Sequence, residues 1–116
     1  MIIISGLNRI RDLISNDIDK GQLGTGTTIA TENDTTLKTE VASTLLTVTK
    51  STADKQINFT YTLTSAGGAS GTYTEFELQK SATPVHFDRI VFTGVSFTLN
   101  GTEDVSVIKR YFIKRG

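Results

Sequence analysis

The stretch Ile57-Asn58-Phe59-Thr60-Tyr61-Thr62-Leu63 decides the fold class. Large apolar residues alternate strictly with polar ones, which is the pattern of a β-strand with one face buried and one face in water. Burying each of the four apolar side chains is worth about 1.5–3 kcal/mol. A shift of one residue in register would turn all of them to solvent, so the pattern also fixes how this strand pairs.

Similar alternation continues on both sides of this strand. It predicts further strands at residues 41–50, 73–80, 86–99 and 104–114. Residues 51–54 and the glycine-rich residues 65–71 are expected to connect strands. Gly94 suggests a bulge, and Asn100-Gly101 predicts a tight hairpin that pairs the last strand with the one before it.

Before the strands lies one short amphipathic segment. Leu7, Ile10 and Ile14 recur at helical spacing, which predicts a helix over residues 6–16 with Ser5 as its N-cap and Gly21 as its stop. A helix this short is marginal alone, so its apolar stripe must pack on something. The sequence leaves two possibilities open, the protein's own sheet or a neighbouring subunit.

The predicted architecture is one mainly β domain over residues 1–116. It is an antiparallel β-sandwich or small barrel with one short N-terminal helix inside residues 1–20 and strands within 41–114. A chain of 116 residues has room for a single modest core.

Composition argues against several classes of function. The formal net charge is zero, so no overall field attracts nucleic acid or a membrane surface, and neither partner is expected. Without cysteine there is no disulfide or thiolate metal site. No apolar run approaches a membrane span, and Met1-Ile2-Ile3-Ile4 is too short for the core of a signal peptide, so we expect synthesis in the cytoplasm without a leader.

Few residues suggest chemistry, and we expect no catalytic residue, cofactor or metal. His86 is the only histidine, and no nucleophile motif accompanies it. Glu75 and Glu77 share a strand face and are expected to face solvent. An irregular calcium site between loops and phosphate contacts by the basic C-terminal stretch stay open as minor alternatives.

One motif is unusual. Gly24-Thr25-Gly26-Thr27-Thr28 predicts a sharp turn and lacks the lysine of a phosphate-binding loop, and Asp34, as a helix cap or in an Asx-turn, precedes Thr35-Thr36-Leu37 and then Glu40. With Glu75-Phe76-Glu77-Leu78 and Arg89-Ile90-Val91-Phe92 further on, this pattern resembles small structural proteins of tailed-bacteriophage virions, of the tail-fibre and baseplate type. Glu77 departs from that pattern, which often has glycine there.

The resemblance implies a non-enzymatic virion component in the tail, baseplate or fibre-attachment region, assembled in the host cytoplasm. Its expected partners are other virion proteins and copies of itself. The alternatives are a capsid decoration or head-fibre protein, and a carbohydrate-binding module that recognises the host, with Tyr73 as one candidate stacking ring. Candidate assembly contacts are Leu7, Ile10, Ile14, Gly67, Gly68, Arg110 and Arg115.

Overall fold

The computed structural model describes residues 1–37, 39–64, 70–81, 85–92, 97–100 and 104–114. Its elements are α1 (Ile4–Asp17), β1 (Lys20–Gly24), the short 3-10 helix η1 (Ala42–Thr44), β2 (Leu46–Thr47), β3 (Thr49–Ala53), β4 (Gln56–Leu63), β5 (Ser70–Tyr73), β6 (Glu75–Lys80), β7 (Val85–Val91), β8 (Phe97–Asn100) and β9 (Val105–Phe112).

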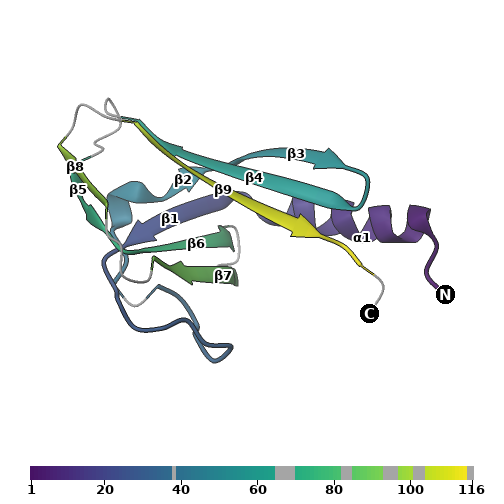
Figure 1. Ribbon diagram of the computed structural model, residues 1–116, viewed down its shortest axis with the longest axis horizontal. Coiled ribbons are helices and arrows are strands. Elements are labelled where there is room, and N and C mark those ends of the chain that lie inside the picture. The colour runs from purple at the N-terminus through teal and green to yellow at the C-terminus, as the bar shows by residue number, and fades with distance from the viewer. Residues whose placement is uncertain (38, 65–69, 82–84, 93–96, 101–103, 115–116) are drawn as a thin grey trace.

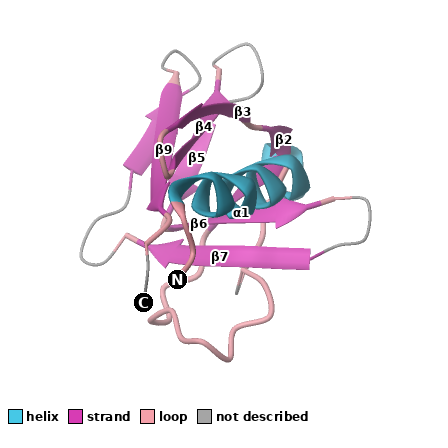
Figure 2. Cartoon of the chain, turned by 90° about the vertical axis from the view of Figure 1, so that its right-hand side faces the viewer, coloured by secondary structure: helices cyan, strands magenta, loops and turns pink. Residues whose placement is uncertain are grey.

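The fold is a small antiparallel β-sandwich with one N-terminal helix, as predicted. One layer is a four-stranded sheet in the order β2-β1-β6-β7, and the other is a three-stranded sheet in the order β3-β4-β9. Strands β5 and β8 pair as a separate two-stranded ribbon at one end (Figure 1). At the other end, α1 lies between the two layers, as the end-on view shows (Figure 2).

The core lies between the sheets and is centred on β4. Its side chains Ile57, Phe59, Tyr61 and Leu63 are at most 1% exposed, which confirms the predicted buried face. From the facing sheet, Phe76 packs edge-on against Tyr61 with ring centroids 5.2 Å apart. Gly21 passes so close to these rings that an added Cβ would lie 2.8 Å from Tyr61.

The helix is longer than predicted and begins differently. Ile3 is the N-cap, and no side chain bonds to the first turn, so the predicted Ser5 cap is wrong. Gly21 does not end the helix but lies within β1, a strand that the sequence analysis missed. Asn8 and Arg11 hold the β3–β4 turn, because Asn8 Oδ1 accepts from the Lys55 N–H at 2.8 Å and Arg11 Nη1 donates to the Ala53 carbonyl at 2.7 Å.

Several strand boundaries were also wrong. Residues 41–50 hold η1, β2 and the first two residues of β3 instead of one strand. The turn expected at 51–54 lies at Asp54 and Lys55. Lys55, the second residue of this turn, has a left-handed φ of 57°. The predicted strand 73–80 is split at Thr74, whose N–H donates to Gly24 and whose carbonyl accepts from Phe92, so the chain changes sheets there.

The last strand does not pair as the Asn100-Gly101 signal predicted. The predicted strand 86–99 is divided into β7 and β8; β8 pairs with β5, and β9 pairs with β4 along its whole length. This register brings Val105, Val107 and Tyr111 onto the core. The glycines of 65–69, the suggested bulge at Gly94 and Gly101 itself lie outside the described residues.

Candidate functional site: a polar layer beneath the loop of residues 25–39

The unusual glycine motif forms the base of a long loop. This loop, residues 25–39, leaves β1 at Gly24 and returns where Gly24 bridges Glu40. In Figure 1 the loop lies below β7. It contacts Glu75 and Arg89 on the sheet face that points away from the core.

Glu75 anchors both ends of this loop. Its side chain is fully buried, and its Oε2 accepts from the backbone N–H of Gly26 at 2.6 Å and of Thr39 at 2.9 Å. The anchor depends on close approach at Gly24, since a Cβ there would lie 2.6 Å from Glu75 Oε2 and 2.5 Å from the Thr39 carbonyl oxygen. Position 24 therefore has no room for a side chain larger than that of glycine. The Glu75 carboxylate accepts the hydrogen bonds of loop N–H groups that have no strand partner.

Arg89, on the neighbouring strand β7, completes the anchor. Its Nε donates to Glu75 Oε1 at 2.8 Å, its Nη1 to Asp34 Oδ2 at 2.9 Å and its Nη2 to the Thr28 carbonyl at 2.9 Å. Burial would lower the pKa of Arg89, but the hydrogen bonds and charges of Glu75 and Asp34 outweigh it and raise that pKa. Asp34 also accepts from the Thr31 N–H at 3.0 Å, so it closes a turn backward along the loop and caps no helix.

A second buried carboxylate lies beside the first. Glu77 is 1% exposed, and the Nδ1 of His86 lies 2.9 and 3.0 Å from its two oxygens. Burial raises the pKa of Glu77 above its ordinary value of 4.5, while the charge and hydrogen bond of His86 act in the opposite direction. The amide of Gln79 donates to the same carboxylate at 3.4 Å.

An irregularity in β7 brings His86 and Arg89 to the same face. The two residues are three apart, so regular alternation would put them on opposite faces. In the observed register Leu78 pairs with Asp88 and Gln79 pairs with His86, which leaves Phe87 as an extra residue, a β-bulge. Asp88 then points to the other side, where it accepts from the Tyr111 hydroxyl and lies 3.3 Å from Lys109 Nζ.

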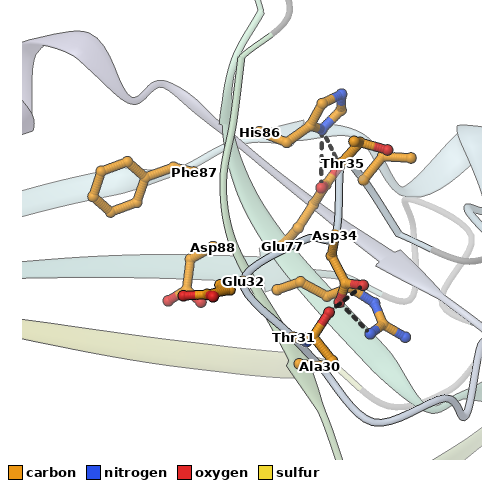
Figure 3. Close-up of a pocket in the computed structure, with 11 residues that line it drawn as sticks. Ala30, Thr31, Glu32, Asp34, Thr35, Glu77, His86, Phe87 and Asp88 are labelled. Carbon is orange, nitrogen blue, oxygen red and sulfur yellow. Dashed lines mark hydrogen bonds and ion pairs between the residues drawn. The ribbon is translucent and has the colours of Figure 1, made fainter.

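A pocket of about 420 Å³ separates the loop from β7 (Figure 3). Its walls come from loop residues near Thr31 and Asp34 and from Glu77, His86 and Arg89. His86 is bound to Glu77, and Arg89 is bound to Asp34 (Figure 3). Within the described part of the chain, no group of three or more histidine, aspartate or glutamate residues could hold a metal ion. The arrangement is therefore suited to fixing the loop in place.

The prediction that Glu75 and Glu77 face solvent was wrong. Both lie on the outer face of the sheet, as alternation requires, but the 25–39 loop covers that face and leaves them 0% and 1% exposed. Nothing in the period-two pattern indicates such a cover. The backbone N–H groups that bind Glu75 come from the loop, 36 and 49 residues away in sequence, and the pattern gives no sign of them.

The predicted assembly contacts are distributed unevenly. Leu7 is 2% exposed and Ile14 packs against the core, so both face inward, as the first of the two packing possibilities expected. Ile10, at 38%, and Arg110 are exposed. Gly67, Gly68 and Arg115 lie outside the described residues. Tyr73 is 3% exposed, so its ring offers no platform for a sugar.

Comparison with protein families, with curated proteins and with solved structures finds no match for this chain. Among the residues that the structure describes, no helix has the length and apolar character needed to cross a membrane.

Proposed function

We propose that this chain is a non-enzymatic structural component of a tailed-bacteriophage virion, in the tail, baseplate or fibre-attachment region, that acts through contacts with other proteins. The observation that carries the proposal is the amount of large apolar surface left outside the core. The exposed apolar side chains are Met1, Ile2, Ile3, Ile4, Ile10, Leu13, Ile29, Leu45, Val85, Phe87, Ile108 and Phe112. Apolar surface that gathers on one element, as it does on α1, is typical of a protein interface.

The shape of the sheets adds support. Strands β3 and β9 are the edges of one layer and β2 and β7 of the other, and each pairs on one side only within the described residues. Such edges offer unpaired backbone groups to a neighbouring chain. On β9 the outward residues include Ile108 at 57% and Phe112 at 61% exposure, next to the cation of Arg110.

The polar groups beneath the 25–39 loop, namely Asp34, Glu75, Glu77, His86 and Arg89, support a structural role. The motif behind the phage resemblance contributes Gly24, Gly26 and Asp34 to one contact unit with Glu75 and Arg89. An active site needs groups that are free to meet a substrate. Here the buried carboxylates and the guanidinium are bound to one another and to loop backbone, which fits a scaffold that holds a loop in a fixed shape.

The test is to find the chain in particles. Phage particles from the strain that encodes it should be purified on a density gradient, digested for mass spectrometry and labelled with an antibody to the recombinant chain. We expect the chain at a fixed stoichiometry and the label on the tail or baseplate. Label on the head would instead favour a capsid decoration protein. Abundant chain in the lysate with none in infectious particles would refute the proposal.

A further inference from the structure

Helix α1 has two apolar sides, and only one of them meets the core. Leu7, Ile14 and Ile18 face the sheets, with Leu7 and Ile18 each 2% exposed. Ile10 and Leu13 lie three residues apart and form a second stripe along the helix, and the N-cap Ile3 stands at the start of the helix. Ile3, Ile10 and Leu13 are 65%, 38% and 54% exposed, so this stripe faces outward.

A pocket lies beside Leu13, at the C-terminal end of this outer stripe. At the C-terminal end of α1, a pocket of about 330 Å³ is lined by Leu13, Ile14, Asp17, Ile18 and Phe87. The N-terminal end of α1 lies at one end of the molecule (Figure 1), and there the side chains of Ile2 and Ile3 are 50% and 65% exposed. A helix of this length spans about 21 Å, so a protruding apolar group and an apolar pocket lie one helix length apart on the same element.

We propose that two copies of this chain pair through α1, antiparallel and about a two-fold axis. The axis brings the Ile2 and Ile3 end of each helix to the partner's pocket at the C-terminal end, so each copy supplies one protrusion and one pocket. Ile10 and Leu13 then pack against their symmetry mates at the centre. An isologous interface of this kind needs no second protein.

Charge favours the antiparallel arrangement over the parallel one. The exposed side chain of Arg9 lies in the N-terminal half of α1, and Asp17, 52% exposed and bridged to Lys80, lies at its C-terminal end. Parallel helices would set Arg9 against Arg9 and Asp17 against Asp17. Antiparallel helices bring the basic half of each against the acidic end of the other, which is the attractive pairing. The dimer would be a building unit of the virion assembly proposed above, and it rests on that proposal only for its biological setting.

Sedimentation equilibrium of the purified chain tests the interface. We expect a concentration-dependent dimer. Ile10→Glu or Leu13→Glu should raise the dissociation constant of the dimer by roughly 30-fold or more, as expected for a residue at the centre of an interface. Far-ultraviolet circular dichroism should stay unchanged, because both side chains are exposed in the single chain. Ile29→Glu is the matched control, since Ile29 is 75% exposed on the 25–39 loop, and its dimer should be unaffected.

Cysteine cross-linking tests the orientation, and the chain has no cysteine of its own. A mixture of Ile3→Cys and Asp17→Cys proteins should oxidise to the mixed dimer in preference to either self-linked dimer. Self-linking of Ile3→Cys alone would indicate parallel helices and overturn the arrangement. A chain that stays monomeric at all concentrations, or a dimer that survives Leu13→Glu, would overturn the interface. Neither result would remove the chain from phage particles, so the two proposals can fail separately.

Discussion

At the scale of single residues, Glu75 carries more of the structure than its place on a strand suggests. Its carboxylate joins both ends of the 25–39 loop and the buried guanidinium of Arg89. A buried charge pair contributes little net stability compared with apolar residues, but removing one partner leaves the other charge buried and unpaired. Substitution of Glu75 should therefore destabilise the fold by much more than the net stability that the ion pair contributes.

We expect Glu75→Gln to lower the free energy of unfolding by roughly 3–5 kcal/mol, because Arg89 loses a buried anionic partner. Urea titration measures this change. Glu32→Gln is the control, since Glu32 lies exposed on the same loop and should change stability by less than about 0.5 kcal/mol. Equal effects of the two substitutions would show that the anchor is not needed.

Glu77 should make stability depend on pH. Because its folded pKa is raised above 4.5 by burial, the folded chain holds this proton at pH values where the unfolded chain has released it. The contribution to stability is complete below pH 4.5 and is lost as pH rises through the folded pKa.

The variant Glu77→Gln has no such proton. Relative to the parent chain, its free energy of unfolding should therefore increase as pH is raised from 4 to 8. Urea unfolding at several pH values measures the difference, and Glu32→Gln serves again as an exposed control. If the curves of parent and variant run parallel across this range, Glu77 does not titrate as its burial implies.

At the scale of the elements, the bulge at Phe87 decides which groups meet. Without it, His86 would turn toward the other face of the sheet and leave Glu77 buried without its ring partner. The bulge also exposes Phe87 itself, whose ring stands edge-on to Tyr111 at 5.6 Å. The bulge thus lets His86 reach Glu77 and places Phe87 in the wall of the apolar pocket beside α1.

Deletion of Phe87 should separate these effects from simple loss of its ring. The deletion puts His86 two residues from Arg89, so regular alternation keeps both on the Glu77 face and we expect the His86–Glu77 contact to survive. Phe87→Ala keeps the bulge and should also keep the contact. Because His86 is the only histidine, its ring protons report the contact directly by nuclear Overhauser effects to Glu77. Loss of those effects in the deletion variant would show that His86 reaches Glu77 only through the bulged backbone.

Sequence patterns predicted those elements whose own residues determine them. The alternation in β4 and the apolar spacing in α1 depend on local burial, and both elements were found. Patterns failed where a distant segment decides the environment. Lys20–Gly24 is a central strand with little alternation, and Glu75 is buried by a loop far away in the chain. The signal in the sequence that pointed to this site was the glycine motif, together with the charged residues Glu75, Glu77 and Arg89 on the neighbouring strands β6 and β7.

At the scale of the whole molecule, the sandwich is held unevenly. Strand β4 is paired on both sides and lies over the core, whereas β3, at the edge of the same sheet, is exposed along its length. Hydrogen exchange should therefore be slowest at the amides of β4, approaching the rate set by global unfolding, and much faster in β3. Exchange measured by NMR checks this order, and equal protection of the two strands would contradict it.

The tip of the 25–39 loop has a practical consequence. Its two ends are fixed by the carboxylate below, while Thr27, Thr28, Ile29 and Ala30 are exposed at its surface. Lengthening a closed loop costs entropy only as the logarithm of its length. Foreign peptides grafted at this position should therefore be displayed without unfolding their carrier.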